Sequence, residues 1–296
     1  MQKIYLNNNL YYEVYKSKNR TIYAPSKPLK DIQKVILNFI KTKYKIKLNT
    51  KDAAKVHCHK KWILKMDIRK FYESFSKEQI EKALDEIYKK VNFPETFTKE
   101  EVYQVCSLEN KLPTGAVTSA YLANISFAQT KIDDELMKFC RDEGINYSRY
   151  MDDMFFSADS KTPLKKAEKL AIKLLEKEGF SINHEKTKYI SDNKRQEILG
   201  LVVNNKEKAV ISSENKRKYR SIFFNYLKAV YLEYRLGINS LFKKKIGYKE
   251  VTGYLAYIKA SDPKFYETMR KFIKSRIKNF GIYDDDEIKK LKKILK

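Results

Sequence analysis

The sequence predicts a helix-rich α+β fold, on three observations. At 43% hydrophobic and 13% aromatic, the 296 residues can bury a substantial core. Segments in which apolar and polar residues alternate, as in strands, are interspersed with longer segments in which apolar residues recur at helical spacing. Only eight glycines and six prolines interrupt the chain, and no repeat or Gly/Ser-rich linker divides it, so we expect one continuous body.

The N-terminal part predicts an extended segment, a helix, a strand and a second helix. Tyrosine, valine and isoleucine alternate with polar residues up to Pro28, which is typical of strands. Residues 29–43 follow helical spacing, and the apolar run WILKMDI predicts a strand at 62–68. Ser76 is placed to cap a helix over 77–90.

The rest of the chain alternates between helices and strands before it becomes wholly helical. Residues 117–140 carry one long helical pattern. The segment INYSRYMDDMFFSA (145–158) predicts two strands joined by a tight turn, followed by a helix over 162–178. GFSINHEKTKYI and EILGLVVNN each predict a further strand. From Ser212 onward the pattern is helical and basic.

The net charge indicates a polyanionic partner. Lys and Arg number 62 against 37 Asp and Glu, a formal charge of +25, which favours nucleic acid or an anionic membrane surface. Residues 204–296 carry 24 Lys and Arg against 10 Asp and Glu, so this segment is the candidate surface for a nucleic-acid backbone. Its candidate contacts are Lys243, Lys244, Lys245, Lys271 and Lys274.

Nothing in the sequence predicts a membrane or an oxidising compartment. No apolar run reaches the roughly 20 residues of a membrane span, and the N-terminus has no apolar signal core. Cys58, Cys106 and Cys140 are odd in number and widely spaced, which is typical of a reducing compartment. We therefore expect a cytoplasmic protein that does not bind a membrane.

Two of the predicted strands end in carboxylates. Asp152 and Asp153 fall at a tight turn, where adjacent carboxylates are stable only in water or against a cation. Asp67 ends another strand. Taken alone, the pair could be a solvated turn, and Asp67 a strand-end cap or an ion-pair partner of Arg69. Together, in so basic a chain, they form the arrangement that two-metal phosphoryl transfer requires, with two Mg²⁺ ions roughly 3.5–4 Å apart.

Six segments resemble the motifs of reverse transcriptases, in the order that this family has them. YMDD resembles YxDD, MDIRKFYESF resembles DIxxFFxSI, and LPTGAVTSAYLANI (112–125) resembles LPQGxPTSPxLxNL. SKNRTIYAP resembles the fingers segment that grips the triphosphate, EGFSINHEKTK the motif after the palm helix, and ILGLVVN the strand that supports the primer end. The resemblance spans nearly the whole chain and is strongest to the small bacterial retron enzymes.

This resemblance implies a right-hand polymerase. The fingers would take residues 1–60 and 77–115, and the palm 61–76 and 116–205. The palm would be an antiparallel sheet backed by helices, of the split-βαβ kind. Residues 206–296 would form a basic helical thumb.

The resemblance also implies roles for individual residues. Asp67, Asp152 and Asp153 would hold two Mg²⁺ ions, with the Ile68 carbonyl as a further ligand. Tyr72 falls where the family places a bulky residue that rejects ribonucleotides, and a core aromatic is the alternative. The nucleotide-binding set would be Arg20, Lys16, Tyr72, Thr114, Gly115 and Lys186. Arg20, Lys16 and Lys186 could otherwise be ordinary surface charges.

Some positions depart from the family pattern. Thr114 stands where the family has Gln, and Val117 and Ala120 replace two prolines. Of the retron marker NAxxH, the chain keeps Ala54 and His57 but lacks the Asn.

A second retron marker, the triplet Val-Thr-Gly, is expected at the start of the primer-grip segment. Here that position contains Ile198, Leu199 and Gly200, of which only Gly200 matches. A Val-Thr-Gly triplet at 251–253 lies in the predicted thumb helices, and we do not count it as the marker.

A retron enzyme would use dNTPs to copy a structured noncoding RNA that serves as both template and primer. Its product would be a branched RNA–DNA hybrid, made in anti-phage defence beside a separate effector protein. One alternative is another bacterial defence reverse transcriptase with a different template or priming rule. Another is a non-catalytic RNA-binding protein of the same fold. The sequence does not predict the oligomeric state.

Overall fold

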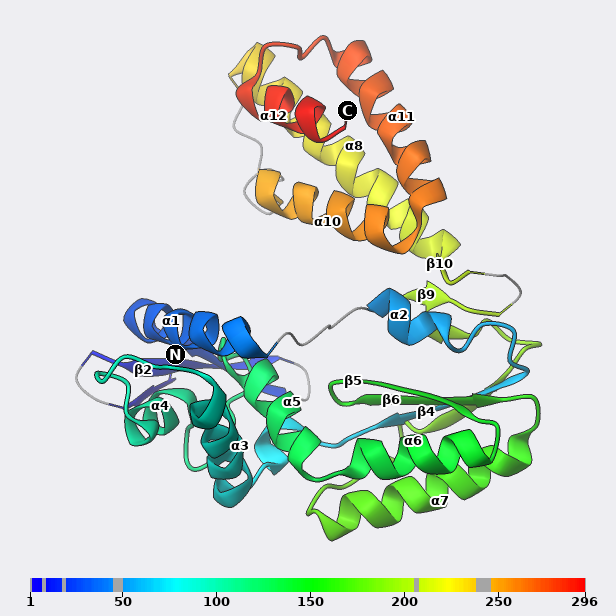
Figure 1. The fold of residues 1–296 in the computed structure, drawn as a ribbon. Helices are drawn as coiled ribbons and strands as arrows, with labels where there is room; N and C mark the ends of the chain where they lie inside the picture. Colours follow the sequence, from blue (N-terminus) through cyan, green and yellow to red (C-terminus); the bar gives the residue numbers. More distant parts are fainter. Residues whose placement is uncertain are drawn as a thin grey trace. The chain divides into compact units, whose positions relative to one another are not determined.

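The computed structural model describes residues 2–6, 9–17, 20–44, 50–204, 208–237 and 246–295, which fall into two compact units (Figure 1). The N-terminal unit comprises residues 1–49 and 60–191. The C-terminal unit combines residues 50–59 with residues 192–296. A short segment that precedes the strand ending at Asp67 therefore belongs with the C-terminal helices.

The N-terminal unit begins with a three-stranded antiparallel sheet followed by a helix. The strands are β1 (Gln2–Tyr5), β2 (Tyr11–Ser17) and β3 (Arg20–Pro25), and the helix is α1 (Lys27–Lys43). Both confirm the predicted extended segment and helix. Pro28 lies in the first turn of α1, where a missing N–H costs no hydrogen bond.

The buried side chain of Gln33 joins α1 to three other segments. Its Nε2 donates to Tyr12 Oη (2.8 Å) and to the Val105 carbonyl oxygen (2.9 Å). Its Oε1 accepts from the Val117 amide (3.2 Å). An amide buried this deeply is stable only when both of its ends are paired, so Gln33 fixes the loop before Val117 against the first sheet.

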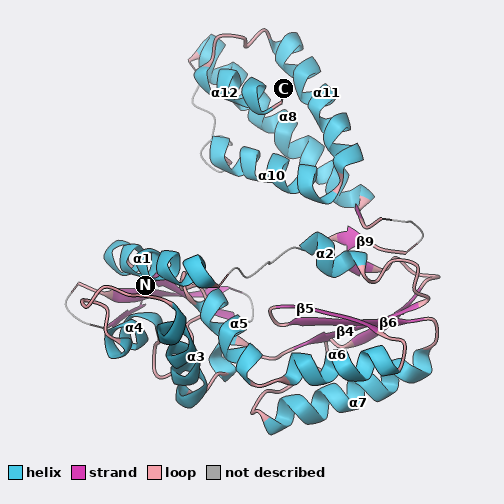
Figure 2. Ribbon diagram, in the orientation of Figure 1, coloured by secondary structure: helices cyan, strands magenta, loops and turns pink. Residues whose placement is uncertain are grey.

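A four-stranded antiparallel sheet, in the order β5-β6-β4-β7, forms the second half of this unit (Figure 2). The strands are β4 (Trp62–Asp67), β5 (Asn146–Tyr150), β6 (Asp153–Ala158) and β7 (Lys188–Ser191). One face packs on α6 (Ile132–Asp142) and α7 (Lys161–Lys177). Its buried residues are Leu64, Met66, Met154, Phe156 and Ala158. The predicted antiparallel sheet backed by helices is confirmed.

Two helices of this unit begin with reciprocal caps. In α3 (Lys77–Lys90), Ser76 accepts from the Gln79 amide while the Gln79 side chain accepts from the Ser76 amide. In α4 (Lys99–Cys106), Thr98 and Glu101 make the same arrangement. The predicted cap at Ser76 is confirmed.

The single helix predicted over 117–140 is wrong. The structure has α5 (Ser119–Gln129) and α6, separated by Thr130 and Lys131. Lys131 has a φ of 63°, a left-handed conformation that interrupts the helix. Three acidic residues in the first turn of α6 then favour a new N-terminus, because carboxylates stabilise that end of the helix dipole.

The two strands predicted after α7 are also wrong in their extent. In GFSINHEKTKYI only the end forms β7, and Ile182 makes a single bridge to Ile68. EILGLVVNN forms a hairpin of β8 (Glu197–Ile198) and β9 (Leu201–Val202). Leu199 and Gly200 turn it, with φ of 50° and 82°.

The described residues of the C-terminal unit confirm the predicted helices. They form α2 (Thr50–Lys55), strand β10 (Val210–Ile211), α8 (Ser213–Leu236), α10 (Tyr248–Ser261), α11 (Pro263–Phe280) and α12 (Asp286–Ile294). No described helix combines the length and apolar character of a membrane span.

Buried Asp262 joins three elements of this unit. Its carboxylate accepts from the amides of Phe265 (3.0 Å) and Ile211 (3.3 Å) and pairs with Lys216 Nζ (2.8 Å). It therefore caps α11 and also holds β10 and α8. The boundaries predicted for fingers, palm and thumb remain a prediction. Residues 50–59, placed in the predicted fingers, and residues 192–204, placed in the predicted palm, group with these helices in the structure.

Four phenylalanines form the centre of the N-terminal core. Phe180 has its ring centroid 5.1 Å from that of Phe75, 5.4 Å from that of Phe127 and 6.4 Å from that of Phe71. All four are at most 3% exposed. They come from the segment after β4, from α5 and from the segment after α7, so they join the segment that follows Asp67 to the helices behind the sheet.

We predict that Phe180→Ala lowers the free energy of unfolding of the N-terminal unit by about 3–5 kcal/mol, because it leaves a cavity between three rings. Urea denaturation followed by circular dichroism measures this. Phe180→Leu, which fills most of the space, should cost clearly less. Equal losses for the two variants would show that the site collapses around either side chain.

Candidate active site

Strand pairing brings the three predicted aspartates together at one end of the four-stranded sheet. Asp67 ends β4 and stands directly opposite Asp153, the first residue of β6. The carbonyl oxygen of Asp152, in the turn before β6, accepts from the Ile68 amide at 2.9 Å. The two predicted strand ends therefore meet, and their acids lie beside one another. Their role as metal ligands remains a prediction.

Arg149 holds the turn that carries Asp152 and Asp153. Its Nη1 donates to the Met151 carbonyl oxygen (3.0 Å), and its Nε and Nη2 donate to the Asp133 carboxylate at 2.8–3.1 Å. Met151 has a φ of 56°, a left-handed conformation that costs free energy and persists only where the surroundings enforce it. The hydrogen bond to Met151 is one such constraint.

The network around Arg149 is nearly closed to water. The Arg149 side chain is 10% exposed, and its guanidinium lies 4.1 Å from the Phe127 ring centroid. Tyr147 Oη also donates to Asp133 (2.6 Å), and Arg149 Nη1 donates to Asn124 Oδ1 (3.1 Å). The sequence pattern did not predict these residues. The sequence signal that could have found them is Arg149 directly before YMDD, together with Asp133 in the acidic first turn of α6.

Two lysines neutralise two of the aspartates. Asp67 is 5% exposed and accepts from Lys186 Nζ at 2.9 and 3.1 Å. Asp153 Oδ1 lies 2.9 Å from Lys65 Nζ. The loop that carries Lys186 is attached to the end of β4, because the Asn183 amide donates to the Asp67 carbonyl oxygen at 2.8 Å.

Among the described residues, no lysine or arginine forms an ion pair with Asp152, so its charge is the least offset of the three. Burial raises the pKa of its carboxyl group above the ordinary value, and the charges of Asp153 and Asp67 raise that pKa further. Its own backbone amide and the charge of Arg20 act in the opposite direction. A cation among the three carboxylates would relieve this repulsion.

The donor set suits Mg²⁺. Three carboxylates offer hard oxygen ligands, and no hydrogen bond to the Ile68 carbonyl oxygen is found among the described residues. In the ranges that the structure describes, no three His, Cys, Asp or Glu side chains already converge as a metal-binding group. Asp67 and Asp153 face lysines instead.

Three of the predicted nucleotide-binding residues, Lys186, Arg20 and Tyr72, lie near the aspartates. Tyr72 lies in the short helix η1 (Tyr72–Ser74), and burial raises the pKa of its phenol above the ordinary value. The charge of Asp152 raises that pKa further, while the charge of Arg20 opposes the rise in the pKa of both Tyr72 and Asp152. Thr114 Oγ1 donates to Glu73 Oε1 at 2.6 Å, beside Tyr72.

Gly115 is required by a close approach of two backbones. The Tyr23 amide donates to the Thr114 carbonyl oxygen (2.8 Å), which holds the loop against β3. Gly115 has a φ of 109°, and a Cβ there would lie 2.9 Å from the Tyr23 carbonyl oxygen. Lys16 lies in β2 opposite Thr21, and no contact between Lys16 and the aspartates is found in the described residues.

The retron-marker residues all lie in the C-terminal unit. Ala54 and His57 are fully buried, and burial lowers the pKa of His57 to about 3, so its imidazole is neutral. Gly200 turns the β8–β9 hairpin, and a Cβ there would lie 3.7 Å from Asn215 Nδ2 and from Tyr257 Oη. Among the candidate phosphate contacts, Lys271 and Lys274 are exposed on α11. Lys243, Lys244 and Lys245 lie outside the described residues.

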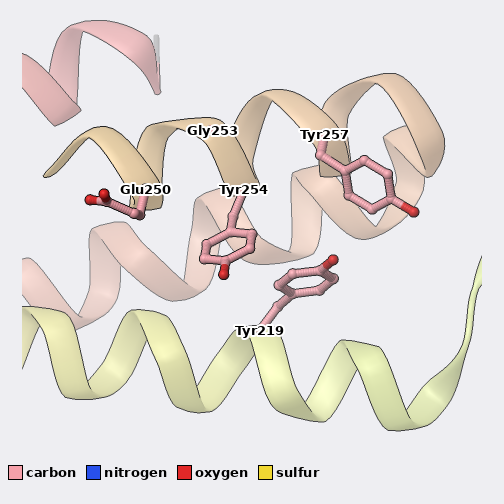
Figure 3. Close-up of a pocket in the computed structure, with 5 residues that line it drawn as sticks. All are labelled: Tyr219, Glu250, Gly253, Tyr254 and Tyr257. Atoms are coloured by element: carbon pink, nitrogen blue, oxygen red, sulfur yellow. The ribbon is translucent and has the colours of Figure 1, made fainter. Parts of the chain in front are cut away.

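A groove of about 470 Å³ lies between α8 and α10 (Figure 3). It is lined by Tyr219, Glu250, Gly253, Tyr254 and Tyr257. The Tyr219 ring centroid lies 5.5 Å from that of Tyr254 and 6.3 Å from that of Tyr257, and Gly253 leaves the floor without a side chain. By contrast, Tyr226 is a core residue whose Oη donates to Glu287.

Comparison with known proteins identifies the class. Residues 8–203 match the family model described as reverse transcriptase (RNA-dependent DNA polymerase). The chain belongs to the reverse transcriptase family and is an RNA-directed DNA polymerase.

Several curated relatives are retron enzymes, which supports the retron type. The Retron Ec83 reverse transcriptase of Escherichia coli is 27% identical over 93% of this chain and 91% of its own. The Retron Ec86 reverse transcriptase of Escherichia coli is 27% identical over 88% and 78%, and the Retron Mx65 reverse transcriptase of Myxococcus xanthus 25% identical over 87% and 62%. Among solved structures, apo telomerase from Candida tropicalis aligns with a TM-score of 0.47 and 14% identity, over 91% of this chain and 60% of that chain.

We predict that Arg149→Lys lowers kcat for nucleotide incorporation by about 10–100-fold with little change in KM, because lysine cannot hold Asp133 and Met151 together and the turn shifts. Steady-state kinetics on a primed RNA template measures this. Arg141→Lys, at the exposed end of α6, is the matched control. A loss of thermal stability with an unchanged kcat would mean that Arg149 supports only the fold.

Proposed function

We propose that the chain synthesises DNA on a structured noncoding RNA by two-metal phosphoryl transfer at Asp67, Asp152 and Asp153. The observation that carries this proposal is the register of β4 and β6, which sets Asp67 opposite Asp153 with Asp152 in the adjoining turn. Strand register is a stronger constraint than a surface cluster of acids, because a slip by one residue would turn each side chain to the other face.

In this proposal the chain's residues hold and orient the reactants. Asp67, Asp152, Asp153 and the Ile68 carbonyl oxygen would hold the ions. Two bound Mg²⁺ ions would supply Lewis-acid activation of the primer hydroxyl and stabilisation of the leaving pyrophosphate. Each remaining role belongs to a side chain or to the backbone near these ligands.

The incoming dNTP would be bound by residues from several segments. Arg20 would contact the triphosphate, with Lys16 as a second contact, and Lys186 would donate a proton as pyrophosphate leaves. The Lys186 ammonium lies 2.9 Å from Asp67, beside the proposed metal ligands. The Tyr72 ring would exclude a 2′-hydroxyl, and the backbone at Thr114 and Gly115 would allow the base pair to approach.

The C-terminal unit would bind the nucleic-acid backbone and unpaired bases. Exposed Lys271 and Lys274, with Lys243, Lys244 and Lys245, would contact phosphates. The groove formed by Tyr219, Tyr254 and Tyr257 offers aromatic faces on which a base could stack. Gly253 leaves the groove open beside these rings, which supports this use, and Glu250 adds one carboxylate at its edge.

The retron relatives support a finer proposal for the product and setting. We infer a branched RNA–DNA hybrid joined through a 2′-hydroxyl, made in the cytoplasm during anti-phage defence beside a separate effector protein. Cys58, Cys106 and Cys140 are free thiols, as a reducing compartment favours. The missing Asn of NAxxH and the Ile-Leu-Gly in place of Val-Thr-Gly support the alternative of another defence reverse transcriptase with its own priming rule.

We predict that Asp152→Asn lowers DNA synthesis by at least about a thousandfold, because several kcal/mol of transition-state stabilisation are lost with one ligand. RNA affinity should be unchanged, since backbone contacts do not involve the metal site. Primer extension and filter binding on the same RNA measure both. Asp192→Asn, an exposed aspartate after β7, is the control. Retained synthesis in Asp152→Asn would remove the metal site from the proposal.

A second prediction concerns the product. Protein purified from cells that carry its native locus should contain a discrete DNA whose mobility shifts on RNase treatment, because the DNA is branched from a locally encoded RNA. Sequencing the nucleic acid with and without RNase tests this. Homopolymeric or protein-linked DNA, or none, would assign the enzyme to the other defence classes.

A further inference from the structure

The Lys65 ammonium lies against Asp153, a carboxylate that the proposed metal site needs. Its Nζ lies 2.9 Å from Asp153 Oδ1, and the two side chains are 26% and 22% exposed. Lys65 precedes Asp67 by two residues in β4, so both point from the same face of the sheet. The three groups therefore share one small region at the end of β4 and β6.

The ion pair is fixed by strand register. Lys65 stands opposite Phe155, and Asp153 is the next residue of β6 on the same face, which makes Lys65 and Asp153 a diagonal cross-strand pair. The Lys65 Nζ also lies 5.3 Å from the Phe155 ring centroid. An ammonium held between a ring and a carboxylate has few other positions to take.

Lys186, the other lysine of the site, differs in both respects. Its side chain is 46% exposed and stands on a loop, so it can follow a triphosphate away from Asp67. Lys65 instead stands on the strand β4, and its side chain is 26% exposed.

We propose that Lys65 weakens the binding of the metal ion held by Asp153, so that this ion binds firmly only when the nucleotide triphosphate arrives. The proposal rests on the metal site of the proposed function. A divalent ion at Asp153 must either share the carboxylate with an ammonium a few Å away or displace it, and both lower its affinity. The triphosphate adds negative charge that offsets the repulsion, so metal and nucleotide each strengthen the binding of the other.

The test compares Mn²⁺ binding, by isothermal titration calorimetry on the full chain without nucleotide, between the wild type and Lys65→Met. The variant should bind Mn²⁺ about two- to fivefold more tightly, the factor that a partly exposed ion pair represents. Melting temperature should also rise more steeply with Mn²⁺ in the variant. If Lys65→Met does not fold, Lys65→Gln provides the same comparison.

Two controls separate this ion pair from general charge. Lys188→Met removes a lysine that stands opposite Lys65 in β7, is exposed and makes no ion pair among the described residues. It should leave Mn²⁺ affinity unchanged, as should Lys65→Arg, which keeps the charge. An equal gain in Lys188→Met would overturn the proposal, because any nearby positive charge would then suffice.

The remaining outcomes distinguish this inference from the proposed function. Unchanged or weaker Mn²⁺ binding in Lys65→Met would overturn the role of Lys65 while leaving the metal site in place. Absence of Mn²⁺ binding in the wild type and in Lys65→Met alike, with a dNTP present as well as without it, or no loss of it in Asp153→Asn, would instead overturn the metal site itself. Tighter binding in Lys65→Met, with both controls unchanged, establishes that Lys65 sets the affinity.

Discussion

The concentration of negative charge at one end of the four-stranded sheet is the constraint on which the rest of the site depends. Register sets Asp67 opposite Asp153, and the adjoining turn adds Asp152. Carboxylates this close repel one another, and burial makes the repulsion more costly, as the raised pKa of Asp152 shows. Two lysines offset part of this charge, and Arg149 holds the backbone turn that carries Asp152 and Asp153.

Arg149 holds the backbone of the turn from the helix-covered face of the sheet, and Lys65 offsets the charge of Asp153 on the opposite face. A left-handed residue such as Met151 costs about 1–3 kcal/mol, and the hydrogen bond from Arg149 lies where that strain is stored. Arg149 is itself neutralised by Asp133, so the buried network adds no net charge to the aspartates. Lys65 and Lys186 pair with Asp153 and Asp67, and the charge of Arg20 acts on Asp152.

The sequence predicted the meeting of the two strand ends better than the elements around them, for physical reasons. Asp67 and Asp153 follow from strand ends, because alternation and the tight turn are local features. The break at Lys131 is a single backbone conformation within a run of good helical spacing, so periodicity does not detect it. The hairpin at Gly200 did carry a glycine signal, but strands of two residues are too short to show alternation.

Long-range placement lay beyond any local pattern. Residues 50–59 precede β4 in the chain but pack with the C-terminal helices, where His57 is fully buried. Arg149 and Asp133 are ordinary charged residues in sequence, and only the fold reveals that they meet. The same limit applies to the departures at Thr114, whose hydroxyl is bound to Glu73 rather than left free to replace the glutamine amide of the family motif.

Lysine shows most clearly why composition alone does not assign function in this chain. Lys65 and Lys186 lie within 3 Å of carboxylates that are largely buried, so each is committed to one partner whose charge it controls. Lys271 and Lys274 are exposed on α11 and form no ion pair among the described residues, so their charge is available to a polyanion. The two sets of lysines differ in their surroundings. Lys65 and Lys186 lie against largely buried carboxylates, whereas the charges of Lys271 and Lys274 lie in water, where salt screens them. In the proposed function, the formal +25 therefore includes lysines that pair with the acids of the site and exposed lysines whose charge would attract nucleic acid.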